Sequence, residues 1–383
     1  MNDRMALDLL VKIMDWDEAE ATRQYAWLKL MAAMKFDGYA DFRAGSRFVE
    51  SLATWLKQFA RSDRPAAYRL VTERLTYIST GELHRVIEAF VPEVVIPRLR
   101  ELVAGEMAIK PYEVWQSADS AEAMRRRLRQ TLFVGMSDGS RIDVLRRGNA
   151  GRISTEQVVP MLNIDDEKWA DLGKKLAEDA KPWDGVNGTA TANTFTDVYL
   201  IDDFTASGTT FVRQKPDGSW SGKLKRFDDL VRKARQSRPD TFPLMNRYSL
   251  NAHFYIATEQ ACRTLHEHLN RVGEAWSDRT YGTCNLTVGL RLPPEIPLAQ
   301  GRDDDALALC DKYYDHELFT RLEKHCREAG QTTMRLGYAD CALPVVLDHN
   351  TPNNSVPLLW AETAGKNGAH AMRPLFHRRD RHA

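Results

Sequence analysis

Cysteine is scarce in this chain of 383 residues: only five occur, widely spaced, and no CxxC pair is among them. That pattern argues against a disulfide framework and against a zinc ribbon. Free thiols in a reducing cytosol are the simplest interpretation, so we expect a cytoplasmic location. The first residues lack a signal-peptide pattern, because Asp8 and Lys12 interrupt the apolar run. No uncharged apolar stretch is long enough to span a membrane, and we expect no membrane association.

An excess of charge of either sign is also missing. Lys plus Arg and Asp plus Glu both total 53, so the formal net charge is zero. A protein that coats nucleic acid needs a basic excess, and the balance argues against that role without excluding a local patch. Residues 125–129 carry four arginines, which fit either a solvated helix face or a nucleic-acid contact. The GxxxxGK[ST], HExxH and GxSxG motifs do not occur.

The pattern of apolar residues changes along the chain. Residues 1–110 show helical spacing, and Ser79 and Glu82 have the spacing of a capping box, before Pro92 and Pro97 interrupt the pattern. We expect an all-α module there, packed on the rest of the chain or on a protein partner. Residues 111–383 alternate strands with helices, which predicts an α/β domain with a mainly parallel sheet. The expected strands are residues 132–135, 198–201, 250–257, 284–290 and 343–347, and the expected helices are residues 142–147, 166–179, 259–272 and 311–329.

Residues 198–210, VYLIDDFTASGTT, combine an apolar strand, two acids and a loop of small and hydroxyl-bearing residues. Ligands bind at the carboxyl ends of strands in open α/β sheets. The loop lets several backbone N–H groups converge on an anion, Gly208 permits unusual backbone angles, and a helix beginning near Thr210 would add its dipole. Asp202 and Asp203 are suited to vicinal hydroxyls or a Mg²⁺-bound ligand. The combination predicts a ribose 5-phosphate site; the alternative is an ordinary strand-to-helix turn with an N-cap.

This segment resembles the PRPP-binding signature of type I phosphoribosyltransferases. Ser207, Gly208 and Thr210 match the signature, whereas Ala206 replaces a usual Thr or Ser. The resemblance implies that Asp202 and Asp203 bind the ribose hydroxyls. It also implies a 5-phosphate loop, whose residues we take to be Thr205, Ala206, Ser207, Gly208, Thr209 and Thr210.

A second loop lies about sixty residues upstream, where type I phosphoribosyltransferases have a loop that contacts pyrophosphate. It follows the apolar residues 132–135, and a plain turn is its alternative interpretation. By resemblance Arg141 would neutralise charge there. The predicted pyrophosphate-loop residues are Ser137, Asp138, Gly139, Ser140 and Arg141.

The C-terminal segments around residues 337–341 and 349–360 resemble a divergent group of phosphoribosyltransferase-like proteins of bacterial conflict systems, which occur beside phage-defence genes. His349 and Asn350 follow an expected strand. Either they form a catalytic base and nucleobase-binding pair over the same crevice, or they belong to an Asn-Thr-Pro turn.

These features define the expected chemistry and its alternatives. As an enzyme the chain would displace pyrophosphate at ribose C1, with Mg²⁺ carried by the ligand and contacted by Asp202 and Asp203. The sequence does not identify the acceptor of the ribosyl group. The loop expected to cover the leaving group, residues 181–193, contains a single basic residue, Lys181, at its edge. Whether the chain is an enzyme therefore stays open. The alternatives are an inactive nucleotide-sensing module acting on a partner and a nucleic-acid-associated scaffold.

Overall fold

The computed structural model describes residues 3–39, 48–181, 193–215 and 217–378. The chain divides into two compact units: Met1–Leu83 with Pro293–Ala383, and His84–Leu292. This division differs from the predicted boundary at residue 110. It arises because strand β1 (Thr76–Ile78) pairs in parallel with strand β9 (Val345–Leu347), so that the C-terminal segment folds with the N-terminal helices.

The first unit is mainly helical and has an aromatic core. Phe36, Phe48, Tyr77 and Phe376 are all buried and contact one another edge-on, tilted or stacked. The strand expected at residues 343–347 exists as β9, but it pairs with β1 and not with the main sheet. The helices of this unit are α1 (Asp3–Met14), α2 (Glu18–Met34), α3 (Phe48–Leu56), α4 (Arg64–Arg69), α12 (Asp304–Lys312) and α13 (Glu317–Glu328).

The expected helix at residues 311–329 is interrupted: it covers the end of α12 and, after a break, the whole of α13. Helix α12 ends at Lys312, and Asp315 accepts a hydrogen bond from the backbone N–H of Glu317 at 3.0 Å. An aspartate that binds the backbone two residues ahead favours a turn over a continued helix. The break therefore has a local cause that apolar spacing alone does not show.

The second unit is built on a five-stranded sheet of order β3-β2-β4-β7-β8 in which every pairing is parallel. This confirms the predicted α/β class with a mainly parallel sheet. The central strands are buried on both faces, as parallel sheets require. Strands β4 and β7 are longer than their apolar runs predicted. The strands are β2 (Thr131–Gly135), β3 (Val158–Val159), β4 (Phe195–Thr205), β7 (Leu244–Thr258) and β8 (Cys284–Leu292).

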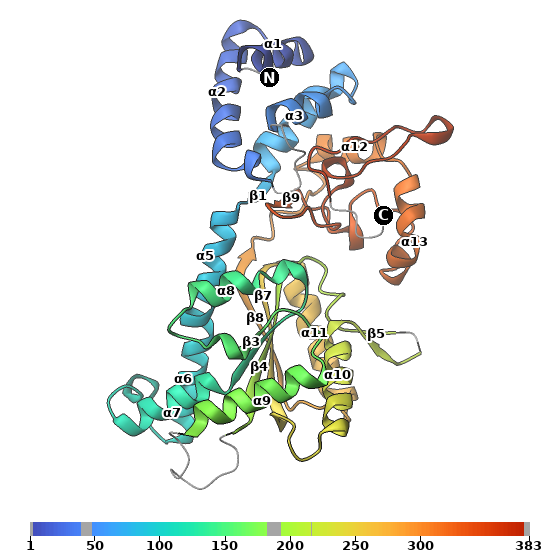
Figure 1. Cartoon of the computed structure of the whole chain (residues 1–383). Coiled ribbons are helices and arrows are strands. Elements are labelled where there is room, and N and C mark those ends of the chain that lie inside the picture. The colour runs from blue at the N-terminus through green and yellow to red at the C-terminus, as the bar shows by residue number, and fades with distance from the viewer. Residues whose placement is uncertain (1–2, 40–47, 182–192, 216, 379–383) are drawn as a thin grey trace. The chain divides into compact units, whose positions relative to one another are not determined.

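Helices cover both faces of this sheet (Figure 1). On one face, apolar residues of α9 (Asp166–Ala180), α10 (Lys223–Ser237) and α11 (Glu259–Ala275) share one core with alternate residues of β2, β4 and β7. On the other face, Phe90 of α5 (Thr80–Phe90) stacks on His253 at 3.8 Å between ring centroids and contacts Tyr199 edge-on. The other helices of the unit are α6 (Ile96–Glu106), α7 (Ala118–Arg129) and α8 (Ile142–Gly148).

The capping box predicted at Ser79 and Glu82 is confirmed: the Ser79 N–H donates to Glu82 at 2.9 Å and the Glu82 N–H donates to the Ser79 hydroxyl at 3.4 Å. The expected interruption at Pro92 and Pro97 is wrong. Helix α5 continues through a π-helical segment, Val91–Val95, into α6. Because the helix is continuous, each proline removes an interior backbone donor, and the wide π turn between α5 and α6 accommodates the resulting misfit.

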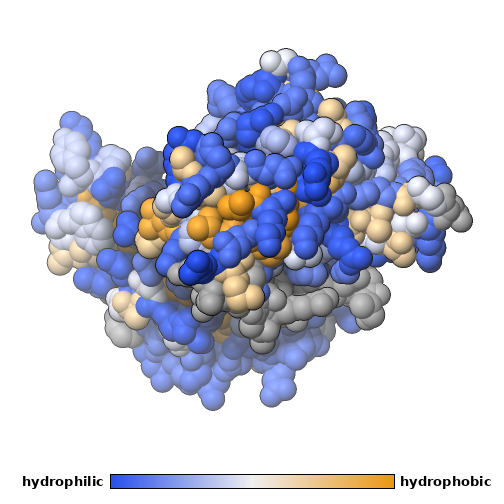
Figure 2. All heavy atoms as spheres, turned by 90° about the horizontal axis from the view of Figure 1, so that it is seen from above, coloured by the Kyte–Doolittle hydropathy of each residue, from blue (hydrophilic) through white to orange (hydrophobic). Residues whose placement is uncertain are grey.

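The face of the molecule seen in Figure 2 is mostly polar. Hydrophilic residues dominate the face shown in Figure 2, and hydrophobic residues gather over only a small part of it. Among the described residues, no helix combines the length and the apolar character needed to cross a membrane. The five cysteines are free, and four of them are buried.

Candidate functional site

The two predicted loops meet at the carboxyl edge of the sheet. Strands β2 and β4 are neighbours, with Gly135 opposite Ile201, so the residues that follow β2 lie beside the end of β4. The Ser137 hydroxyl donates to Asp202 Oδ1 at 2.6 Å. The backbone N–H of Met136 donates to the Ile201 carbonyl at 2.8 Å. The structure therefore brings together segments about sixty residues apart, at the edge where parallel sheets bind ligands.

Asp202 is buried and has three side-chain partners. Its Oδ1 accepts hydrogen bonds from Ser137 and, at 3.3 Å, from Ser140, and its Oδ2 forms an ion pair with Lys223. Burial raises the pKa of Asp202, the Lys223 charge opposes that rise, and the neighbouring Asp203 adds to it. A carboxylate in this setting is strongly constrained, because its charge is stabilised only by partners inside the protein.

Asp203 lies in a different environment from its neighbour. Both acids belong to β4, which extends to Thr205, so they do not follow the strand as expected. Strand β4 continues because Phe204 and Thr205 pair with Ile256 and Ala257 of the long strand β7. Successive strand residues point to opposite faces. Asp202 therefore faces α10, whereas Asp203 lies on the face of Tyr255.

Asp203 is half-buried and closely approached by the upstream loop. A Cβ atom at Gly139 would lie 2.4 Å from Asp203 Oδ2, so any larger residue there would displace the Asp203 carboxylate. Burial raises the pKa of Tyr255, and the charges of Asp203 and Asp202 raise it further. The Tyr255 hydroxyl is buried with no hydrogen-bond partner among the described residues. Asp203 thus sits between a glycine and a phenol that stays protonated.

The loop that follows β4 is fixed to helix α11. The Thr258 hydroxyl donates to the Ala206 carbonyl at 2.6 Å and also caps α11 by accepting from the Ala261 N–H at 3.0 Å. Gly208 has φ +74°, and a Cβ atom there would lie 2.8 Å from the Ala261 carbonyl oxygen. Glycine is therefore required at 208 both for its backbone angle and for space.

Donors in this loop remain available for a ligand. The backbone N–H groups of Ser207, Gly208 and Thr210 donate to no carbonyl within the described ranges. The hydroxyls of Ser207 and Thr209 lie 2.9 Å apart, and Thr210 is exposed. Successive unpaired amides in a turn containing a left-handed residue form a concavity that suits an anion. This arrangement agrees with a phosphate cradle at residues 205–210, and Ala206 is buried with its side chain away from solvent.

The helix expected near Thr210 begins instead at Lys223. A short antiparallel hairpin, β5 (Arg213–Gln214) and β6 (Trp220–Ser221), separates the loop from α10. Gly222 has φ +110° and a Cβ atom there would lie 2.4 Å from the Phe211 carbonyl oxygen, so the hairpin folds back tightly on the loop. The hairpin separates α10 from the loop in sequence, but the Lys223 N–H donates to the Thr210 carbonyl at 3.3 Å, so the beginning of α10 lies beside the end of the loop.

Lys223 is the functional residue that sequence reasoning missed. It begins α10 and its ammonium group pairs with Asp202. A signal was present: the apolar positions 224, 227, 231 and 234 have helical spacing, and Gly222 lies two residues before the first of them. Reading those positions would have placed a lysine at the beginning of a helix. The ion pair itself depends on the hairpin, which no spacing rule reveals.

The upstream loop is organised by Ser140. Its buried hydroxyl donates to the Ile201 carbonyl at 2.7 Å and accepts from the N–H groups of Met136 and Ser137, each at 3.1 Å. Asp138 is exposed, and Arg141 is half-buried with φ +46°. The Arg141 side chain has no hydrogen-bond or ion-pair partner among the described residues. It is thus a cation without an assigned structural role at the loop's end.

The remaining predicted residues belong to other parts of the chain. His349 and Asn350 belong to the first unit, where Asn350 and Leu347 form an isolated antiparallel bridge after β9. The interpretation of a shared crevice assumed that they follow a strand of the main sheet. They follow β9, which pairs with β1 instead. Residues 182–192 of the expected leaving-group loop lie outside the described residues.

Three of the four arginines in the basic stretch of α7 form ion pairs. Arg127 Nε lies 2.9 Å from the fully buried Asp197, and Arg129 Nε lies 2.6 Å from Asp179. Arg125 pairs with Glu122 on the same helix. These contacts favour a structural role over a nucleic-acid contact.

The donor set for a divalent cation is small. Within the described ranges, no group of three or more His, Cys, Asp and Glu side chains is arranged to hold a metal ion. Asp202 and Asp203 are two carboxylates on opposite faces, and Asp202 is already paired with Lys223. Only a cation that brings most of its own ligands, such as Mg²⁺ on a pyrophosphate, fits such a set.

A parallel sheet with an acid pair and a small-residue loop at its carboxyl edge defines a phosphoribosyltransferase-like protein. The comparison with family models agrees: the model described as PRTase-CE matches residues 52–378. The chain therefore belongs to the PRTase-CE family, as the resemblance predicted. Among curated proteins and among solved structures, no match was found.

Proposed function

We propose that the carboxyl edge of the sheet binds PRPP, or a related ribose-5-phosphate nucleotide, together with Mg²⁺. The observation that carries the proposal is the loop at residues 206–210, whose unpaired amides stand beside the two acids. The 5-phosphate would accept from the amides of Ser207, Gly208 and Thr210. Asp203 would accept from a ribose hydroxyl, and Mg²⁺ carried by the pyrophosphate would supply charge neutralisation at the leaving group.

Turnover would be displacement at ribose C1. The bond between C1 and the pyrophosphate oxygen breaks, a bond to the acceptor forms, and the acceptor loses its proton. Arg141, at the end of the upstream loop, and Lys223 are the cations of the described site, and both would stabilise the departing charge. Lys223 must leave Asp202, at least in part, to do so.

Calorimetry on the full chain with PRPP and Mg²⁺ tests the binding step. Asp203→Asn should weaken binding by about tenfold or more, since hydrogen bonds to charged groups contribute roughly 1.5–3 kcal/mol. Asp229→Asn, on the exposed side of α10, is the matched control and should bind as the wild type does. Absence of PRPP binding to the wild-type chain would overturn the proposal.

A second candidate is a nucleotide sensor without turnover, acting on a protein partner. The Asp202–Lys223 ion pair favours it, because it occupies one of the two acids of the signature with a protein cation. Pyrophosphate release measured over a panel of bases and nucleotides separates the two. Release with any acceptor supports the transferase, and tight binding with no release supports the sensor.

We also propose that the protein acts in a bacterial anti-phage defence system. The support is the resemblance of its C-terminal segments to phosphoribosyltransferase-like proteins of conflict systems, together with the family match. Phage plating on cells that carry the gene with its natural neighbours is the test. Asp203→Asn should restore plating if the site is required, and unchanged plating in the absence of the gene would contradict the role.

A further inference from the structure

The opposite, amino edge of the same sheet carries a cavity of about 540 Å³ with an unusual lining. Four of its nine lining residues are arginines and only one is an acid, Asp278. The lining has no aromatic side chain and only one apolar residue, Pro239. The volume is that of a small-molecule site, which typically spans roughly 300–1,000 Å³. The arginines are Arg232, Arg235, Arg247 and Arg279.

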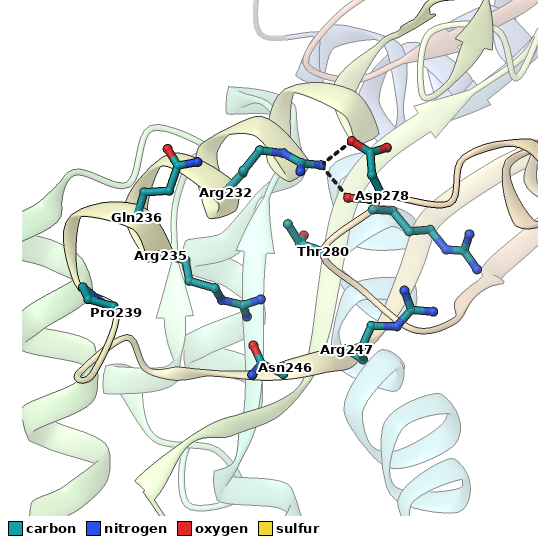
Figure 3. A pocket seen from close by; sticks show the side chains of 9 residues that line it. Arg232, Arg235, Gln236, Pro239, Asn246, Arg247, Asp278 and Thr280 are labelled. Atoms are coloured by element: carbon teal, nitrogen blue, oxygen red, sulfur yellow. Dashed lines mark hydrogen bonds and ion pairs between the residues drawn. The ribbon is translucent and has the colours of Figure 1, made fainter.

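The cavity lies between the end of α10, the beginning of β7 and the segment that leads into β8. Figure 3 shows Arg235 extending from α10 toward the strand that carries Asn246 and Arg247, and Arg232 extending from the same helix to Asp278 on the facing loop. Three separate elements thus contribute cations to one space. Several guanidinium groups lining one cavity are suited to phosphate, because each planar fork can donate two parallel hydrogen bonds.

Three of the four arginines also have structural partners. Arg232 pairs with the buried Asp228 at 3.0 Å and with Asp278 at 3.4 Å. Arg235 donates to the carbonyls of Leu244 and Met245 at 3.3 and 3.1 Å. Arg279 donates to backbone carbonyls, the shortest bond being 2.6 Å to Trp276. Carbonyl partners leave the full positive charge in place, so the cavity keeps an excess of cations.

Arg247 has no such structural role. It is exposed, and its side chain has no hydrogen-bond or ion-pair partner among the described residues. Its φ is +57°, an angle that a non-glycine residue adopts at a cost. The residue lies in a bulge of β7, since Phe195 pairs with Leu244 whereas Asp197 pairs with Ser249. Bulges re-aim side chains, and this one presents Arg247 to the cavity.

The bulge is held in place by the neighbouring turn. The Gly282 N–H donates to the Tyr248 carbonyl at 2.9 Å, and a Cβ atom at Gly282 would lie 2.8 Å from the Arg247 carbonyl oxygen. Strained backbone that surrounding contacts fix in place is typical of ligand sites. We propose that this cavity binds a small molecule carrying two or more phosphate groups, at a site separate from the cradle. The excess of cations sets the charge of the ligand, and the lack of aromatic lining argues against base stacking.

Titration of the full chain with inorganic tripolyphosphate, in EDTA and at one ionic strength, tests this proposal. Without a divalent cation the acid pair at the cradle repels this probe. Arg247→Gln should weaken binding by about tenfold or more, as expected for loss of a charge-assisted bidentate contact. Lys233→Gln removes the same charge from an exposed position of α10 outside the lining and should change binding by less than about threefold.

The following outcomes of the titration would contradict the proposed site. No binding by the wild type, or equal weakening by Arg247→Gln and Lys233→Gln, would show only diffuse charge attraction. Loss of binding in Asp203→Asn, with Arg247→Gln unaffected, would place the probe in the cradle. If a single-stranded oligonucleotide competes with tripolyphosphate and binds more tightly, the ligand of the cavity is nucleic acid and not a small molecule. PRPP binding in Arg247→Gln, measured in parallel, shows whether the cradle is intact, so failure here is distinct from failure there.

Discussion

The two edges of the central sheet differ in whether their polar side chains have partners within the protein. At the carboxyl edge, Asp202, Ser137, Ser140 and Lys223 bond to one another, and the acid is buried. At the amino edge, Arg247 projects into an open cavity and bonds to no described side chain. Polar groups whose partners lie within the fold contribute to folding, whereas groups facing solvent do not. Substitutions at the carboxyl edge should therefore lower stability, and substitution of Arg247 at the amino edge should change ligand binding alone.

The largest effect is expected for Lys223→Met. Removing the ammonium group leaves the buried Asp202 carboxylate without its ion-pair partner, which should cost about 3 kcal/mol of unfolding free energy near pH 8. Chemical denaturation of wild type and variant measures it. Asp202→Asn in the same chain should restore most of the loss, because the stranded charge is then gone.

The pH dependence of this loss has a defined sign. The pKa of Asp202 is raised in the folded protein, and loss of Lys223, which lowers it, raises it further. A carboxyl whose folded pKa lies above its unfolded value favours folding when protonated. The deficit of Lys223→Met should therefore shrink as the pH falls through the folded pKa and grow as the pH rises. A deficit independent of pH between about 4 and 8 would contradict the buried-charge argument.

Gly222→Ala should have the next largest effect. The methyl group would meet the Phe211 carbonyl oxygen at 2.4 Å, and φ is +110°, so we expect a loss of about 2–3 kcal/mol. Gly218→Ala is the matched control in the same hairpin, because φ is +81° there but nothing lies within 4 Å of the added atom. It should cost only about 1 kcal/mol. If thermal unfolding showed the same loss of stability for both variants, the close contact between Gly222 and Phe211 would contribute nothing to stability.

Ser140→Ala should cost about 2 kcal/mol, because a buried hydroxyl with both donor and acceptor partners disappears. The amides of Met136 and Ser137 would lose an acceptor, and Asp202 would keep Ser137 and Lys223. Hydrogen exchange of those two amides is the direct measurement. Unchanged protection would show that the upstream loop is held by other contacts.

The sequence located the carboxyl edge better than the amino edge, for a physical reason. Residues 198–210 contain a strand, two acids, hydroxyl groups and a glycine in order. The groups of this site are therefore consecutive in the sequence and can be recognised there. Lys223 reaches Asp202 only because a hairpin of two short strands folds back at Gly222. The arginine cavity gathers side chains from three elements, and its register depends on a bulge in β7 that alternation of apolar residues does not encode.

The pairing of β1 with β9 shows the same limit. The apolar residues 345–347 predict a strand, but a three-residue strand has no sequence signal for its partner. Parallel partners can lie anywhere along the chain, and here they are separated by the whole second unit. His349 and Asn350 come directly after β9 and therefore belong to the first unit.

The smallest stability effect is expected at the amino edge and tests the comparison most directly. Arg247→Gln should change the unfolding free energy by less than about 0.5 kcal/mol, since no described group loses a partner and glutamine accepts the same backbone angle no worse than arginine. Arg235→Gln in the same cavity should cost about 1 kcal/mol, because two strand carbonyls lose a donor. Denaturation of the two variants side by side measures the difference. If Arg247→Gln were the more destabilised, the bulge would be a structural device, and the exposed arginine would no longer point to a ligand.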